Sequence, residues 1–213
     1  MHLAVLRSRA LTGIDAPPVS VEIHLANGLP AFAIVGLAET EVRESRERVR
    51  AAILNCGFEF PNRRITVNLA PADLPKEGGR FDLPMALGLL AANGQINPER
   101  LARLECAGEL SLAGELRPVR GALAMALALR QASVAGNNPR ELLLPEASAA
   151  EAALVGEALV RATAHHAADA GEQQRATDHA CGSRRCGAEE RAAAATSAAE
   201  RRCALAAERA AIL

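Results

Sequence analysis

The sequence predicts an α/β or α+β sandwich, and two features of its patterning support that fold class. The first 36 residues contain three strand-like runs, at residues 3–6, 19–25 and 31–35. Beyond them, helix-like and strand-like segments alternate as far as residue 160. A β-rich start followed by alternating units is typical of helices packed on a sheet.

The opening strands are predicted to run antiparallel. Residues 19–25 alternate hydrophobic and polar side chains, which is the period of a half-buried strand. The segment Ala26-Asn27-Gly28 supplies turn chemistry before the run at residues 31–35. We therefore expect an antiparallel opening with a turn between the second and third strands.

A helix is predicted from about Thr40 to Asn55, ended by Gly57. It carries four arginines that form a candidate DNA-contact strip: Arg43, Arg46, Arg48 and Arg50. Three glutamates on the same helix favour the alternative, a solvated face whose charges pair within the helix. The expected pairs are Glu44–Arg48 and Glu47–Arg50.

The central stretch, residues 65–92, is predicted to form a strand, a glycine loop and a buried helix. Ile65, Val67 and Leu69 alternate with polar residues, and the prolines that follow lack the N–H that a strand ladder needs. Asp82 is positioned to cap a helix whose remaining residues, 83–92, are almost wholly hydrophobic.

The loop before that helix is a candidate anion or partner-contact loop. Its candidate residues are Lys76, Gly78, Gly79, Arg80 and Asp82. Such a loop can bind a phosphate through its backbone N–H groups and the N-terminus of the following helix. A tight turn at two glycines with positive φ, followed by a capped helix, is the alternative, and short glycine motifs favour it. The nucleotide-binding pattern G-x-x-x-x-G-K-[ST] does not occur in the chain.

Shorter elements are expected to follow the central helix. A strand at residues 105–112 turns through residues 113–115, and a helix covers residues 118–131. A buried strand at 141–145, a helix at 147–154 and a strand at 158–160 complete the predicted domain.

Composition excludes several function classes. The net charge is −1, so no global electrostatic attraction to nucleic acid follows. The chain has no Trp or Tyr, which makes base stacking on exposed aromatics an unfavoured binding mode. We find no signal peptide and no hydrophobic run near the ~20 residues of a membrane span. Five cysteines, an odd count, then suggest reduced thiols and a cytoplasmic protein without membrane contact.

Residues 161–213 form an Ala- and Arg-rich tail of different composition. From residue 161 to residue 204 there is no Val, Ile, Leu, Met or Phe, so we expect a disordered or partly helical segment, and a frameshift is one origin of it. His179, Cys181 and Cys186 do not have the spacing of paired zinc ligands, so no metal site is predicted.

Several phrases carry a family resemblance. Residues 75–80 (PKEGGR) resemble the loop of Lon-type proteases that carries the nucleophile. A closer resemblance is to the Mg-chelatase-like competence family, ComM/YifB, over about residues 1–160. The matching phrases are residues 8–13 (SRALTG), 28–32 (GLPAF), 34–37 (IVGL), 44–49 (ESRERV), the central stretch and 108–119 (GELSLAGELRPV).

The resemblance implies an amino-terminal, Lon-protease-like domain of the ribosomal-protein type. Members of the family join this domain to an AAA+ ATPase domain that works as a hexamer on branched DNA during recombination of incoming DNA. Lon-type proteases use a Ser–Lys dyad, in which the amine takes the hydroxyl proton. Aligning the motifs places Arg80 at the Ser position and Leu123 at the Lys position, and neither side chain performs that chemistry.

We therefore expect a non-catalytic binding or assembly module. Its expected partners are further copies of itself or the family's AAA+ domain, with DNA as a further possibility through the family. ATP and Mg²⁺ are expected only for the AAA+ domain, and no cofactor for this chain. The alternative is a residual hydrolase or ATPase that uses the Gly78-Gly79 loop.

Overall fold

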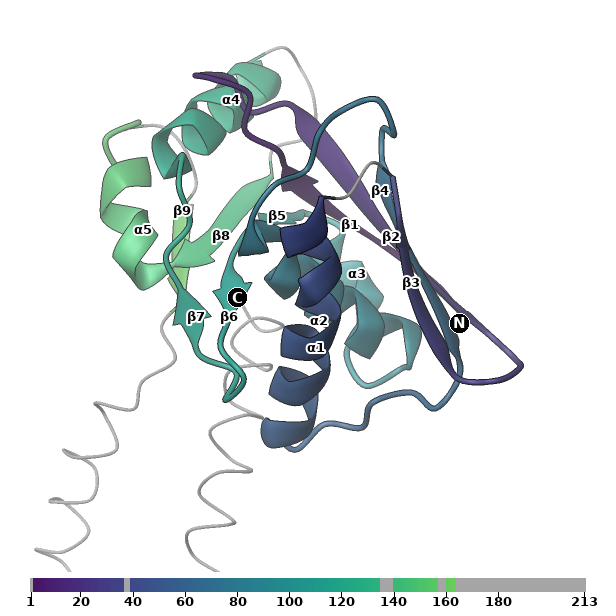
Figure 1. Cartoon of the computed structure of the whole chain (residues 1–213). Helices are drawn as coiled ribbons and strands as arrows, with labels where there is room; N and C mark the ends of the chain where they lie inside the picture. Colours follow the sequence, from purple (N-terminus) through teal and green to yellow (C-terminus); the bar gives the residue numbers. More distant parts are fainter. Residues whose placement is uncertain (1, 37–38, 135–139, 157–159, 164–213) are drawn as a thin grey trace, which may run out of the picture.

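The computed structural model describes residues 2–36, 39–134, 140–156 and 160–163, and these form an α/β domain (Figure 1). The strands are β1 Leu3–Arg9, β2 Pro18–Ala26, β3 Ala31–Val35, β4 Arg64–Ala70, β5 Leu104–Cys106, β6 Glu109–Leu110, β7 Leu116–Arg117, β8 Glu141–Pro145 and β9 Val160–Thr163. The helices are α1 Thr40–Asn55, the short 3₁₀ helix η1 Gly79–Phe81, α2 Asp82–Ala92, α3 Pro98–Leu101, α4 Ala122–Val134 and α5 Glu146–Ala152. The predicted α/β class is confirmed.

Seven strands form one mixed sheet in the order β3-β4-β2-β1-β5-β8-β9, and β6 and β7 form a small hairpin beside it. β2 pairs antiparallel with both β1 and β4, whereas all other pairs in the large sheet are parallel. The predicted antiparallel opening is therefore right for β1 and β2. β3 also runs antiparallel to β2, but the two strands are not neighbours, because β4 lies between them and pairs antiparallel with β2 and parallel with β3.

Helices α1 and α2 cover one face of the sheet and build the main core. Strands β1, β2 and β4 bury alternate residues against them, as a period of two requires. Every residue of α2 is buried, since the helix lies between the sheet and α1 (Figure 1). The helix approaches β2 so closely that a Cβ at Gly88 would lie 2.2 Å from Cδ1 of Ile23.

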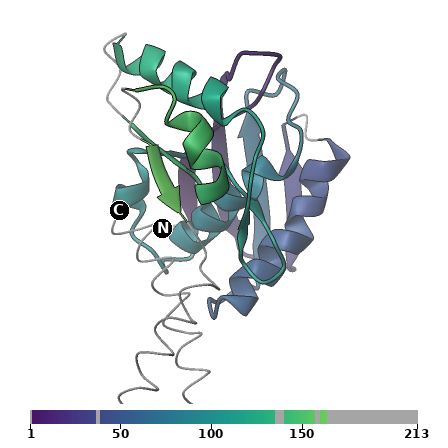
Figure 2. The same ribbon diagram turned by 90° about the vertical axis from the view of Figure 1, so that its left-hand side faces the viewer.

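Helices α4 and α5 build a second core on the opposite face, at the β8–β9 end of the sheet (Figure 2). Leu142 and Leu144 of β8 belong to this second core, while Leu143 between them belongs to the first. Because neighbouring side chains of a strand point to opposite faces, the two cores lie on the two sides of the sheet. The same face over β1–β4 carries exposed Leu3 and Val5.

Three predicted boundaries need correction. The strand predicted at residues 105–112 is split into β5 and β6, which belong to different sheets. The helix predicted at 118–131 begins at Ala122 instead, after Gly121 with φ of 77°. β9 ends at Thr163, so the last strand crosses the predicted domain end at residue 160. The tail beyond Thr163 lies outside the described residues.

Candidate functional site

The glycine loop connects β4 to α2 and lies against α1 and the β6–β7 hairpin. Gly78 has a φ of 70°, as predicted, and its N–H donates to Oε2 of Glu41 at 3.3 Å. Gly79 does not have positive φ, so that part of the prediction is wrong. Its lack of a side chain is required by contact instead, because a Cβ there would lie 2.5 Å from Cγ of Glu109.

Asp82 anchors the loop to two other elements. Its carboxylate is fully buried and accepts hydrogen bonds from Arg48 at 2.7 and 3.2 Å and from the Leu110 N–H at 3.2 Å. The predicted role as helix cap is wrong, since Phe81 occupies the N-cap position and makes no side-chain cap bond. Burial raises the pKa of Asp82, and the hydrogen bond from Arg48 opposes that rise. The same bond raises the pKa of Arg48.

Lys76 and Arg80 point into the protein rather than toward solvent. Lys76 is fully buried, and its Nζ donates to the Pro71 carbonyl. Burial lowers the pKa of Lys76, and the charge of Asp73 opposes the effect. Arg80 is 8% exposed, and burial lowers its pKa also. Its Nη1 has no hydrogen-bond partner within the described part of the chain.

The two positions aligned with the protease dyad lie on different parts of the fold. Arg80 belongs to η1, which packs against α1, α2 and β6. Leu123 belongs to α4, which packs against α5 and β8, and its N–H donates to Oε1 of Glu151 at 3.2 Å. The hydroxyl of Ser111, which is also buried, accepts from the Glu115 N–H at 3.0 Å and so supports the β6–β7 turn.

The structure divides the predicted arginine strip on α1. Arg48 pairs with Asp82, a residue 34 positions away, rather than with the predicted Glu44. Glu47 pairs with Arg46 at 2.9 Å instead of with Arg50, the partner predicted for it. Sequence spacing favours local pairs, but Asp82 is buried and therefore gains more from a counter-ion than an exposed glutamate does. Arg43 remains exposed on the outer surface of the helix.

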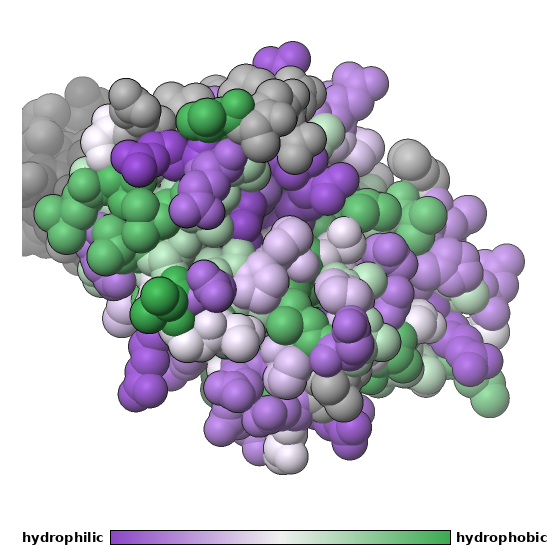
Figure 3. Space-filling model, turned by 90° about the horizontal axis from the view of Figure 1, so that it is seen from above, coloured by the Kyte–Doolittle hydropathy of each residue, from purple (hydrophilic) through white to green (hydrophobic). Residues whose placement is uncertain are grey.

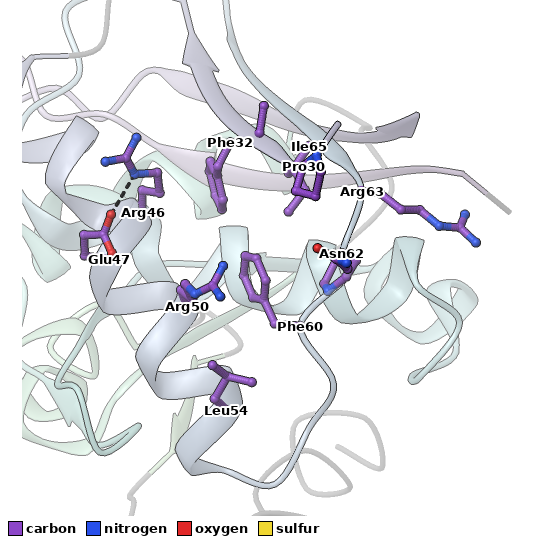
Figure 4. A pocket seen from close by; sticks show the side chains of 12 residues that line it. Pro30, Phe32, Arg46, Glu47, Arg50, Leu54, Phe60, Asn62, Arg63 and Ile65 are labelled. Atoms are coloured by element: carbon purple, nitrogen blue, oxygen red, sulfur yellow. Dashed lines mark hydrogen bonds and ion pairs between the residues drawn. The ribbon is translucent and has the colours of Figure 1, made fainter. Parts of the chain in front are cut away.

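A cavity of about 460 Å³ opens between α1, β3 and the segment at residues 60–63 (Figure 4). Phe32 and Phe60 stack in it with ring centroids 6.2 Å apart. The guanidinium of Arg50 lies over the Phe60 ring, 4.9 Å from its centroid. This cavity was not predicted from the sequence, because its three walls come from separate segments. The one sequence feature that points to the cavity is the small number of phenylalanines: the chain has four, and two of them line it.

The remaining surfaces and side chains of the described residues indicate no further site. The face seen from above mixes hydrophilic side chains with small separate groups of hydrophobic ones (Figure 3). Burial raises the pKa of the Cys106 thiol. None of the helices in the described ranges has the length and hydrophobicity needed to cross a membrane. Those ranges also hold no group of three or more potential metal ligands, and His179, Cys181 and Cys186 lie outside them.

Comparison with known proteins identifies the family. The family model described as subunit ChlI of Mg-chelatase matches residues 21–147, which is more than half of the chain. The chain belongs to this Mg-chelatase-like family. It is 50% identical over 155 residues to YifB of Salmonella typhimurium, covering 73% of this chain and 29% of that protein. It is 49% identical over 157 residues to the competence protein ComM of Haemophilus influenzae, covering 74% and 30%.

A third relative, YifB of Escherichia coli, is 54% identical over 126 residues, which cover 59% of this chain and 25% of that protein. The predicted resemblance to ComM and YifB is thus confirmed. The matched part of this Mg-chelatase-like chain spans less than a third of the length of these relatives.

Proposed function

We propose that the described domain is a non-catalytic binding and assembly module of a ComM/YifB-type protein. In proteins of the relatives' length it would act together with an AAA+ ATPase domain during recombination of incoming DNA. Its partners would be the AAA+ domain and further copies of itself, with ATP and Mg²⁺ used by the AAA+ domain. The family membership and the name of the Haemophilus relative, competence protein ComM, support this assignment.

The observation that carries the proposal is the use of the loop's charged residues as structural anchors. Lys76 holds the Pro71 carbonyl, and Asp82 joins Arg48 of α1 to the Leu110 N–H of β6. The Asp82 contacts link α1, α2 and β6, and the Lys76 contact holds the loop in its own conformation. A group that acts on a substrate must instead reach the reacting atom.

One observation favours the alternative, a residual hydrolase. A buried lysine with a lowered pKa is the kind of amine that serves as a general base. A nucleophile is needed beside it, however, and the residue aligned with the protease serine is Arg80. We therefore rank hydrolysis second and include it in the test.

A chimaera tests the proposal. The segment of Haemophilus ComM that aligns with this chain is replaced by residues 1–163, and transformation frequency is measured. We expect transformation close to that of unmodified ComM, and its loss when the segment is deleted. A stably produced chimaera without transformation would contradict the assembly role.

A parallel assay tests the alternative on the purified full chain. Casein and a small ester are offered as substrates, and we expect no hydrolysis. Hydrolysis that disappears in Lys76→Met, with the fold retained, would establish the hydrolase instead.

A further inference from the structure

β3 forms one edge of the large sheet, and the described part of the chain places no strand on its outer side. Its sequence, Ala-Phe-Ala-Ile-Val, contains neither a charge nor a proline. Edge strands are usually protected by charged residues, prolines or a covering segment, because their free backbone groups can pair with another chain. This edge therefore has the features of a pairing surface.

The backbone of β3 presents groups suited to such pairing. The Ala31 N–H donates to the Arg63 carbonyl beside β4 at 3.4 Å. In a parallel ladder, alternate residues direct their N–H and C=O toward the same neighbour. Phe32 and Ile34 consequently direct theirs toward the outer edge, where an added strand would find donors and acceptors.

The 460 Å³ cavity lies between α1 and the β3–β4 end of the sheet, with Phe32 of β3 and Ile65 of β4 in its lining. Phe32 of β3, Phe60 and Leu54 of α1 supply its hydrophobic walls (Figure 4). Alternate side chains of a strand point to the same face of a sheet, so every second residue of an added strand would face α1. The groove between an edge strand and a helix thus combines backbone pairing with a side-chain pocket.

The charge of the groove selects the partner chemistry. Arg46, Arg50 and Arg63 line it, against the single carboxylate of Glu47. Glu47 pairs with Arg46, whereas Arg50 lies over the Phe60 ring. Acidic groups would find hydrogen-bonding guanidinium partners there, beside a hydrophobic surface for one apolar side chain.

We propose that the groove between β3 and α1 binds an extended acidic peptide segment of a protein partner. The segment pairs its backbone with β3, inserts an apolar side chain beside Phe32 and Phe60, and places flanking acidic side chains at Arg46 and Arg50. This inference deepens the proposed function, on which it rests, by specifying one surface and the chemistry of its partner.

The test uses the purified full chain and a fluorescein-labelled peptide. In the peptide, aspartate, phenylalanine and aspartate occupy alternate positions, with threonine between them, and fluorescence anisotropy reports binding. We expect saturable binding that weakens roughly tenfold in Arg50→Gln, because a charge-assisted contact is lost. Arg43→Gln is the matched control, since Arg43 lies on the same helix outside the groove. It should leave the affinity nearly unchanged.

Backbone pairing has its own test. Two versions of the peptide are N-methylated on alternate sets of amides. An added strand directs only one set toward β3, so one version should lose binding and the other should keep it. Equal effects of the two methylation patterns would exclude strand addition.

Three other outcomes would overturn the inference. The first is that the peptide does not bind. The second is that Arg43→Gln and Arg50→Gln weaken peptide binding equally, which indicates non-specific electrostatic attraction. The third is that a single-stranded oligothymidine displaces the labelled peptide at a lower concentration than unlabelled peptide does, which assigns the groove to nucleic acid. Failure of peptide binding with a functional ComM chimaera would refute this inference alone, whereas a non-functional chimaera would refute the proposed function.

Discussion

The ion pair between Arg48 and Asp82 provides the sharpest stability test of the glycine-loop architecture. Arg48→Met removes the counter-ion and leaves the Asp82 carboxylate fully buried, with the Leu110 N–H as its backbone donor. Removing one partner of a buried pair costs about 3–5 kcal/mol, and we expect the lower end because the Arg48 side chain is 22% exposed.

The assay is thermal and urea unfolding followed by circular dichroism, since the chain has no Trp or Tyr for fluorescence. A loss of about 3 kcal/mol corresponds to a decrease in Tm of roughly 6–12 °C for a domain of this size. Arg46→Met is the matched control on α1, because its pair with Glu47 is exposed and should cost at most about 1 kcal/mol. The double variant Arg48→Met/Asp82→Asn should recover part of the loss, since a neutral amide still accepts from Leu110.

The loss in Arg48→Met should also depend on pH. Without the opposing arginine, burial raises the pKa of Asp82 further above its ordinary value of 3.8. A folded state that holds this proton more tightly than the unfolded state loses stability as pH rises above 3.8. The deficit should therefore be full at neutral pH and shrink as the pH falls toward 4. A deficit below about 1 kcal/mol, or one independent of pH, would show that Asp82 does not need Arg48 as a counter-ion.

Three further predictions concern the loop and the domain end. Gly79→Ala should lower the free energy of unfolding in urea by about 1–3 kcal/mol, because the added Cβ overlaps with the Glu109 side chain. Glu109→Ala should recover part of this loss. An unchanged free energy of unfolding in Gly79→Ala would show that the Glu109 side chain moves away without cost. Burial lowers the pKa of Lys76 in the folded state below its ordinary value of 10.5, so the unfolded chain holds this proton more tightly. The stability of the unchanged chain relative to Lys76→Met should therefore rise as the pH increases from neutral toward 10.5. A stability difference that stays constant or falls with pH would contradict the burial of the charge. A chain ending at Thr163 should have a Tm within a few degrees of that of the full chain, because every buried hydrophobic residue of the described domain lies before residue 156. A larger decrease in Tm would show that residues after Thr163 contribute to stability.

Local patterning was enough to predict most elements of the fold. The patterning predicts helices at residues 40–55 and 83–92. α1 has the predicted bounds, and α2 begins one residue earlier, at Asp82. The alternation at residues 65–69 predicted β4, whose Ile65, Val67 and Leu69 are buried. These signals survive because each depends only on side-chain period and on the glycine or proline at a segment end.

Strand order was not predictable in the same way. The turn after Ala26 suggested that β2 and β3 are neighbours, yet β4 pairs with both. A turn sequence reports only that the chain changes direction. β3 and β4 are parallel neighbours joined through α1, because a parallel pair needs a crossover connection of this kind. Non-local pairing of this kind leaves no local pattern.

The charged residues of the glycine loop can be singled out from the sequence, but their arrangement was not predicted. The loop residues were identified by glycine and charge, whereas the burial of Lys76 and Arg80 and the link from Asp82 to Arg48 depend on how α1 approaches the loop. A charged residue beside glycines suggests an exposed anion site, because burial of a charge is rare without a partner. The partner of Asp82 was 34 residues away, and the spacing of the two gave no indication of their contact.

The most direct measurement of the central claim is the transformation frequency of Haemophilus influenzae whose ComM carries this domain with and without Lys76→Met. Lys76 is the loop's buried amine, and a catalytic reading requires it, whereas an assembly module requires only that the fold be kept. We expect equal transformation frequencies for the two chimaeras when both are produced at the same level. A Lys76→Met chimaera that is folded and abundant, but transforms no better than a strain lacking the segment, would contradict this expectation.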